Sequence, residues 1–125
     1  MKLVHCVAGC LVLASASALA DATARIVVQH SFLAGFRYYE GRSLWEDMRV
    51  GDPLTLVREP GNPHDPYAVR VEWRGHTLGY VPRRENGHLA RQMGHGAPLA
   101  GRITDLHKAR NGRNRVSYEI SVPLK

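Results

Sequence analysis

Cysteine is nearly absent from this chain of 125 residues. Its two cysteines, Cys6 and Cys10, lie at the N-terminal end, inside a segment that we expect to be removed. The rest of the chain can therefore form no disulfide and offers no thiol nucleophile or cysteine metal ligand. The sequence also lacks a glycine-rich phosphate loop with its lysine, which excludes an ATPase of the P-loop class. Stability has to come from packing alone.

Metal-binding spacing is missing as well. Seven histidines are present, yet no two of them stand as His-x-His or His-x-x-x-His beside carboxylates. We therefore expect no metal and no cofactor. His64 beside Asp65 is the one pair that suggests acid-base or nuclease chemistry, but no nucleophile and no paired acidic residues accompany it. The sequence predicts no catalytic residue and a protein that is not an enzyme.

An apolar segment opens the chain. A lysine precedes an apolar run from 3 to 13, and small residues follow up to Ala20. This order is typical of a secretory signal, so we expect residues 1–20 to be a signal peptide cleaved after Ala20. Residues 21–125 would then be one exported domain, periplasmic or secreted, with no membrane attachment after cleavage. An uncleaved membrane anchor and a start codon assigned too far upstream are the alternatives.

Positive charge dominates the remainder. The net charge is +6 at pH 7, and removal of Lys2 leaves sixteen cations against eleven acidic residues, or +5. Fourteen of those sixteen cations are arginine. Arginine offers a planar fork to phosphate and can stack on bases, so an anionic partner is favoured. Compositional bias of the genome is the alternative explanation for the arginine excess.

The hydrophobic pattern is that of short strands. In the clearest of them Val69, Val71 and Trp73 alternate with Arg70 and Glu72, so the two sets face opposite ways. β-Branched or alternating apolar residues predict six strands in all: 26–33, 54–57, 68–73, 77–81, 99–106 and 116–122.

Turns and short helices separate these strands. Arg74-Gly75 and Asn111-Gly112 predict tight turns. Capping-box spacing from Ser43 to Glu46 predicts one short helical turn. Asn86 is expected to cap a second helix, which carries on its apolar face Leu89, Ala90 and Met93.

No internal repeat, parallel βαβ alternation or second domain is visible in the sequence. The pattern therefore predicts a mainly β fold, a six-stranded β-barrel with one or two short helices. Gly79 lies inside the strand expected at 77–81, which indicates a bulge, a barrel corner or the close approach of a ligand.

Polar residues concentrate in a loop with three prolines, which rigidify it between two strands. It reads Arg58-Glu59-Pro60-Gly61-Asn62-Pro63-His64-Asp65-Pro66-Tyr67, followed by Ala-Val-Arg-Val. Together with Gly79-Tyr80-Val81-Pro82 and the upstream Gly35-Phe36-Arg37-Tyr38-Tyr39-Glu40-Gly41, this loop resembles the signature of the HIRAN family. The three motifs stand in the same order, and the resemblance runs from about 26 to 122.

The resemblance implies a small OB-like barrel, known in helicase-like transcription factors, that captures the 3′ end of single-stranded DNA. It therefore predicts a nucleic-acid-binding module whose partner is single-stranded nucleic acid and which has no small-molecule substrate. HIRAN domains often accompany helicase modules, so a helicase-like or nuclease partner is also expected.

Site residues carry over by position in the motifs. Arg37 and Tyr38 would meet the terminal nucleotides, Tyr38 by stacking on a base. Asp65 would accept a hydrogen bond from the terminal sugar hydroxyl, and Arg83 would contact phosphate. Stacking, arginine forks and a carboxylate acceptor each suit these roles physically.

Three more residues complete the expected binding site: Asn62, His64 and Tyr80. His64 stands where the animal pattern has a tyrosine, and Tyr80 where it has a histidine. Gly61 replaces an asparagine. For Asn62 and Asp65 the alternative is a structural role, holding the loop by side-chain to backbone hydrogen bonds.

Other residues are interpreted as structural. Tyr39 and Trp45 are expected to pack. Arg70 is expected to be a solvated strand residue, unless the face of the barrel that carries it is the binding face. A different function also stays open, because an exported protein could keep the HIRAN barrel and bind a protein or an anionic envelope component.

Overall fold

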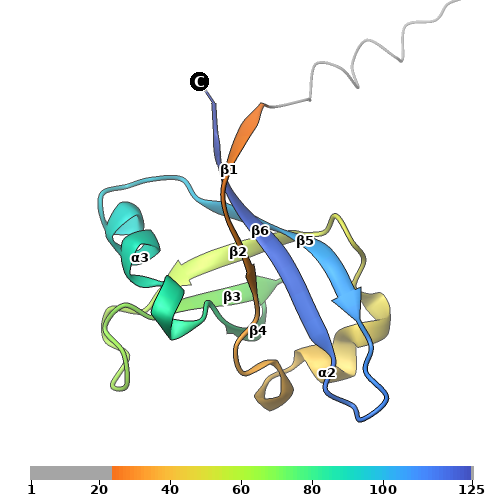
Figure 1. Cartoon of the computed structure of the whole chain (residues 1–125). Helices are drawn as coiled ribbons and strands as arrows, with labels where there is room; N and C mark the ends of the chain where they lie inside the picture. The colour runs from red at the N-terminus through yellow and green to blue at the C-terminus, as the bar shows by residue number, and fades with distance from the viewer. Residues whose placement is uncertain (1–23, 125) are drawn as a thin grey trace, which may run out of the picture.

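Six antiparallel strands form one sheet in residues 24–124, the part of the chain that this computed structural model describes (Figure 1). They are β1 (Arg25–Phe32), β2 (Pro53–Arg58), β3 (Val69–Trp73), β4 (His76–Tyr80), β5 (Ala100–His107) and β6 (Arg115–Pro123). Each strand end lies within one residue of the predicted one, which confirms the mainly β prediction. The expected signal peptide, residues 1–20, lies outside the described residues.

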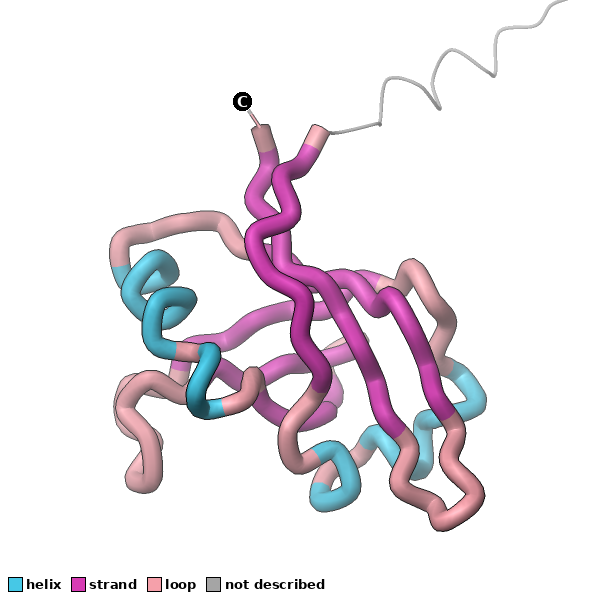
Figure 2. Tube along the Cα trace, viewed as in Figure 1, coloured by secondary structure: helices cyan, strands magenta, loops and turns pink. Residues whose placement is uncertain are grey.

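Five short helical segments connect these strands within the described part. They are η1 (Phe36–Tyr38), α2 (Gly41–Leu44), η2 (Trp45–Asp47), η3 (Arg83–Glu85) and α3 (Gly87–Gly94). Figure 2 shows them on two sides of the sheet, α3 with η3 on one side and η1, α2 and η2 on the other. No helix in residues 24–124 has the length and apolar character needed to cross a membrane.

The sheet curls until its two outer strands almost meet. Its order is β1-β6-β5-β2-β3-β4, so β1 and β4 are the edges. Beyond the end of β1, Ala34 pairs with Tyr80 in an isolated bridge, with N to O distances of 2.8 and 3.0 Å. The OB-like barrel is thus confirmed, although its seam is joined by a single bridge and not by a full ladder.

Gly79 makes this bridge possible. Its φ is +152°, and a Cβ atom there would lie 2.5 Å from the carbonyl oxygen of Ala34. The β3–β4 ladder also shifts register between Val71 and Glu72. The glycine in the strand therefore marks a bulged ladder and the close approach of the chain's own backbone.

Alternation in β3 builds the centre of the core. Val69, Val71 and Trp73 are 0%, 0% and 3% exposed, whereas Arg70 and Glu72 lie on the other face, as predicted. Burial of large apolar side chains supplies most of the stabilisation in a domain of this size. The core is completed by Leu33, Phe36, Met48, Leu54, Leu56, Leu78, Val81, Leu89, Ala90, Ile103, Val116, Tyr118 and Ile120.

Two predicted helix caps are wrong. The helix α2 begins at Gly41, so Ser43 is already inside it and its Oγ donates to the carbonyl of Glu40 at 2.9 Å. Asn86 stands directly before α3, but its side chain caps nothing and is needed elsewhere. The apolar face of α3 is confirmed, because Leu89 and Ala90 are buried.

The ends of the described chain lie side by side. Arg25 pairs with Pro123 across β1 and β6, and the amide of Leu124 donates to the carbonyl of Ala24 at 2.9 Å (Figure 1). β6 returns from the long β5–β6 hairpin, whose predicted turn is confirmed, although its loop spans 108–114.

Candidate nucleic-acid interface

The proline-rich loop between β2 and β3 is organised by Asn62. The Oδ1 atom of Asn62 accepts hydrogen bonds from the backbone amides of His64 and Asp65, at 2.8 and 3.2 Å. Its Nδ2 atom donates to Oε1 of Glu59 at 3.0 Å. The predicted alternative for Asn62, a loop-holding role, is therefore what the structure contains.

Asp65 is held as a carboxylate by several donors. Asn86 Nδ2 donates to Oδ2 at 2.8 Å, and the amide of Tyr67 donates to Oδ1 at 2.9 Å. Hydrogen bonds from Asn86 and Tyr67, followed by the nearby charges of Arg83 and Arg58, lower the pKa of Asp65. Its side chain is 16% exposed. Asp65 thus combines a loop-holding role with an ionised acceptor that still reaches solvent.

Asn86 is a functional candidate that the sequence reasoning assigned to a helix cap. It is 3% exposed and reaches from the start of α3 to the loop carboxylate. A buried amide needs partners for its polar atoms, which explains why its side chain turns to Asp65. An asparagine directly before an apolar helix is typical of a helix cap, whether or not its side chain makes a distant contact. Only the tertiary structure therefore distinguishes the cap from a partner of Asp65.

Arg83 lies across the same loop. Its side chain is 73% exposed, its Nε is 3.7 Å from Oδ2 of Asp65, and its guanidinium donates to the carbonyl of His64. The turn η3 that carries it is tied to β1, where Ser31 Oγ donates to Oε1 of Glu85 at 2.6 Å. Arg83 is therefore attached to a fixed element but keeps an accessible guanidinium.

Tyr80 faces the loop from the end of β4. Its hydroxyl donates to Oε1 of Glu59 at 2.9 Å, and its ring centroid is 5.8 Å from that of Tyr39. Burial, and next the hydrogen bond to Glu59, raise the pKa of Tyr80 to about 12. The neutral phenol of Tyr80 and the ring of Tyr39 form one wall of a cleft, and the Tyr80 hydroxyl uses its proton in the hydrogen bond to Glu59.

These side chains surround one cleft of about 410 Å³. Five of the seven predicted site residues line it: Asn62, His64, Asp65, Tyr80 and Arg83. Tyr39, interpreted from the sequence as a packing residue, also lines the cleft and is 39% exposed. Ala34, which pairs with Tyr80 in the bridge at the seam, lines the cleft as well.

Arg37 and Tyr38 line an adjoining hollow of about 510 Å³ and not the cleft itself. Ala34 belongs to both, so the two depressions meet there. Tyr38 is 70% exposed, and Arg37 lies over its ring at 4.8 Å while donating from Nη2 to its hydroxyl at 2.6 Å. An exposed aromatic face with a cation beside it suits base stacking and phosphate contact.

The β5–β6 hairpin adds cations that sequence reasoning missed. Arg113 and Arg115 line the same hollow as Arg37. Arg115 lies 6.0 Å over the ring of Phe32, which is 48% exposed. Within residues 24–124, Arg37, Arg113 and Arg115 form no ion pair with a carboxylate. In the sequence, the arginines that flank the Asn-Gly turn were the feature that could have indicated this cluster of cations.

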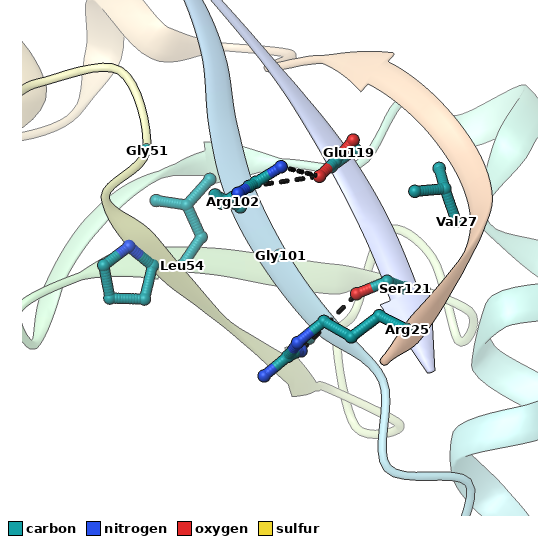
Figure 3. Close-up of a pocket in the computed structure, with 10 residues that line it drawn as sticks. Arg25, Val27, Gly51, Leu54, Gly101, Arg102, Glu119 and Ser121 are labelled. Carbon is teal, nitrogen blue, oxygen red and sulfur yellow. Dashed lines mark hydrogen bonds and ion pairs between the residues drawn. The ribbon is translucent and has the colours of Figure 1, made fainter. Parts of the chain in front are cut away.

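A hollow of about 400 Å³ between β1, β2, β5 and β6 has a different character (Figure 3). Arg102 donates twice to Oε1 of Glu119, at 3.1 and 2.6 Å, and Arg25 reaches Ser121 Oγ at 3.5 Å. Among the residues that the structure describes, no aromatic side chain and no predicted site residue lines this hollow. Its arginine Arg102 is paired with Glu119, whereas the cleft contains the exposed guanidinium of Arg83 and two tyrosine rings.

No group of three or more histidine, cysteine, aspartate or glutamate side chains in the described residues is arranged to hold a metal ion. Arg70, expected to be a solvated strand residue, is instead bound to Glu59 and Glu72. The accessible charge at the site is therefore arginine, and the fixed negative groups are Asp65 and Glu59.

A small, curled antiparallel sheet with an aromatic and arginine-lined cleft at its seam defines a compact β-barrel binding module of the OB-like class. The HIRAN domain model matches residues 26–125, so the chain belongs to the HIRAN family. HIRAN domains are generally nucleic-acid-binding modules. No curated protein is significantly similar in sequence to this chain.

Two solved structures share the fold. A protein from Lactobacillus plantarum has 25% sequence identity and a TM-score of 0.71, over 83% of this chain and 100% of its own. The HIRAN domain of human HLTF has 23% identity and a TM-score of 0.63, over 78% of this chain and 75% of its own. The predicted family and fold are confirmed.

Proposed function

We propose that this protein binds single-stranded nucleic acid and holds its 3′ end in the cleft. The observation that carries the proposal is the convergence of an ionised Asp65, an accessible Arg83 and the Tyr39–Tyr80 wall in one cleft that opens at Ala34 onto Arg37 and Tyr38. Family membership supports nucleic acid as the ligand class.

Asp65 supplies the expected preference for a free end. A terminal sugar hydroxyl can donate to the partly exposed carboxylate, whereas a nucleotide inside a strand has no such hydroxyl at that position. A terminal phosphate would bring about two negative charges to the carboxylate and be repelled. Arg83, beside Asp65, would bind the last bridging phosphate through its exposed guanidinium.

The rest of the strand would leave over Ala34. In the adjoining hollow Tyr38 offers an exposed face for stacking, and Arg37, Arg113 and Arg115 surround it with positive charge. Stacking tolerates any base and phosphate pairing ignores sequence, so recognition would depend on the end and not on base identity.

Anisotropy with fluorescent oligonucleotides tests this proposal. The purified protein should bind a strand with a free 3′ hydroxyl more tightly than the same strand with a 3′ phosphate, by about tenfold or more. Asp65→Ala and Arg37→Ala should both weaken binding to the free end. Equal affinity for the two strands, unchanged in both variants, would refute end recognition.

We further propose that the protein is exported and acts by binding, without catalysing a reaction itself. The signal-like segment 1–20 supports export, and the family's role as a binding domain supports the absence of catalysis. A helicase-like or nuclease partner would supply any chemistry. Mass spectrometry of the protein from its native cells should find a mature N-terminus at Asp21, and an intact N-terminal segment would contradict cleavage.

A second candidate function is protein binding through β1. This strand is an edge of the sheet, and Ile26, Val27 and Val28 are 48%, 42% and 42% exposed. An edge strand with exposed β-branched residues can accept a further strand from a partner. Under this alternative, nucleic-acid binding would be weak and indifferent to the end, and Val27→Lys would abolish capture of the protein partner.

A further inference from the structure

Glu59 ties together segments that come from three parts of the fold. It follows β2 and accepts from Asn62 Nδ2 at 3.0 Å, from the Tyr80 hydroxyl at 2.9 Å and from the guanidinium of Arg70. Its side chain is 20% exposed and does not line the cleft. Glu59 therefore lies behind the cleft and contacts two residues that line it, Asn62 from the loop and Tyr80 from β4.

On the loop side, Glu59 fixes the orientation of the Asn62 amide. A carboxylate only accepts hydrogen bonds, so it selects the NH₂ end of Asn62 and turns Oδ1 toward the amides of His64 and Asp65. A flipped amide would point two donors at those backbone N–H groups. The backbone that presents Asp65 thus depends on the acceptor oxygen of Glu59.

On the strand side, the same oxygen atom holds Tyr80. Oε1 of Glu59 accepts from both Asn62 and the Tyr80 hydroxyl. The Tyr80 backbone forms the bridge to Ala34, and its ring stands against Tyr39. One carboxylate oxygen therefore sets the separation between the loop wall and the aromatic wall.

Arg70 holds Glu59 in place, and this ion pair occupies its guanidinium. It binds Oε2 of Glu59, and its Nε donates to Oε2 of Glu72 at 3.0 Å. Burial acts to raise the pKa of Glu59, but hydrogen bonds donated by Asn62, Tyr80 and Arg70 outweigh it and hold that pKa below its ordinary value. Arg70 thus supports Glu59 from outside the cleft, and its charge is already paired with two carboxylates.

We propose that Glu59 is the positioning residue that sets the preference of the cleft for a free strand end. The specificity part of this inference rests on the proposed function, whereas the positioning part does not. Glu72 is a matched control, because it also binds Arg70 and is also 20% exposed but contacts neither Asn62 nor Tyr80.

Glu59→Gln and Glu72→Gln separate positioning from general stability. Glu59→Gln keeps the shape of the side chain but replaces one carboxylate oxygen by an NH₂ group. This group points either at Arg70 or at Asn62 and Tyr80, so the donors on that side lose their acceptor. We expect the affinity ratio between free and phosphate-blocked 3′ ends to fall about tenfold in Glu59→Gln and to be retained in Glu72→Gln.

Amide hydrogen exchange gives a readout that needs no nucleic acid. The amides of His64 and Asp65 should exchange about tenfold faster in Glu59→Gln and at the wild-type rate in Glu72→Gln. If Glu59→Gln fails to fold, Tyr80→Phe replaces it: it removes only the hydroxyl contact, and should reduce the affinity ratio while keeping the aromatic wall.

The outcomes distinguish the two proposals. A lower ratio and faster exchange in Glu59→Gln alone support the inference. Equal behaviour of the two glutamine variants in both assays overturns it. Faster exchange in Glu59→Gln, with a wild-type protein that ignores the strand end, overturns the proposed end recognition and the specificity role, and leaves Glu59 as an anchor of the loop.

Discussion

Arg70 and Arg83 differ in what their surroundings leave them able to do. Arg70 is 27% exposed and is bound by two carboxylates, whereas Arg83 is 73% exposed and lies 3.7 Å from a single one. A guanidinium that is already paired gains little from a phosphate, because it must first give up a partner. Arg83 is therefore the cation of the cleft that is available to the ligand.

Replacing Arg83 should weaken binding without unfolding the protein. Arg83→Ala should lower affinity for single-stranded DNA about tenfold and reduce the slope of log K against log salt by about one, because one phosphate contact is lost. Arg84→Ala is the control, since Arg84 is the exposed neighbour on the same turn and does not line the cleft. Anisotropy titrations at several salt concentrations measure both. Equal effects of the two variants would indicate nonspecific charge.

Tyr38 should contribute through its aromatic face. It is 70% exposed, so its removal costs the fold little. Tyr38→Ala should lose about 1 to 3 kcal/mol of binding free energy, the usual range for stacking on one base. Tyr38→Phe keeps the ring and should retain most of the affinity. Comparable loss in both variants would mean that the hydroxyl contact with Arg37, and not stacking, matters.

At the scale of single elements, the seam between β1 and β4 positions the cleft. Gly79→Ala would place a methyl group against the carbonyl oxygen of Ala34 at 2.5 Å, at a φ of +152°. We expect a loss of about 2 to 3 kcal/mol in the free energy of unfolding, together with weaker binding, because Ala34 and Tyr80 both line the cleft.

Gly61→Ala is the matched control for this change. Gly61 lies in the proline-rich loop, and a Cβ atom there would meet nothing within 4 Å. The substitution should be neutral or stabilise the fold slightly, by restricting the unfolded chain. Urea unfolding of both variants measures the difference. A Gly79→Ala protein as stable as Gly61→Ala would show that the seam is not constrained.

The strands could be predicted because their signal is local. In β3, side chains alternate between core and surface, and that period is visible in five consecutive residues. The loop of the cleft could also be located, since its prolines and polar residues are contiguous. The curl of the sheet that brings Ala34 to Tyr80 depends on distant strands, and the sequence pattern contained no equivalent signal.

The site residues that sequence reasoning missed have tertiary roles. Asn86 fits a helix cap and turns instead to Asp65, 21 positions away. Tyr39 is an aromatic residue in the upstream motif and was interpreted as a packing residue, yet it lines the cleft and its ring centroid is 5.8 Å from that of Tyr80. Arg113 and Arg115 share a hollow with Arg37 because the β5–β6 hairpin folds beside η1.

At the scale of the whole molecule, carboxylates with lowered pKa values couple stability to pH. Asp52 is the clearest: the indole of Trp73 and the amide of Arg49 donate to its Oδ2 at 2.9 Å each, and the bond from Trp73 is the main cause of its lowered pKa. Glu59 and Asp65 share this direction. Such groups stabilise the fold above their unfolded pKa values and lose that contribution as the pH falls through the folded ones.

The free energy of unfolding should therefore be constant near neutral pH and fall below about pH 4. Asp52→Asn should be less stable at pH 7 and show a shallower decrease in acid, since it keeps an acceptor for Trp73 but cannot titrate. Asp105→Asn, at an exposed position of β5, is the control. Urea unfolding at pH 7 and pH 3 measures this. Parallel curves for wild type and Asp52→Asn would contradict the assignment.

The pairing of Ala24 and Arg25 with Leu124 and Pro123 has a practical consequence for engineering. Ala34, at the cleft, is separated from these ends by the length of β1, eight residues or roughly 26 Å. Neighbouring ends make a domain suitable for insertion into a loop of a host protein. Residues 24–124 could therefore be inserted into a fluorescent reporter, which would present the cleft to solvent and report on the binding of single-stranded nucleic acid.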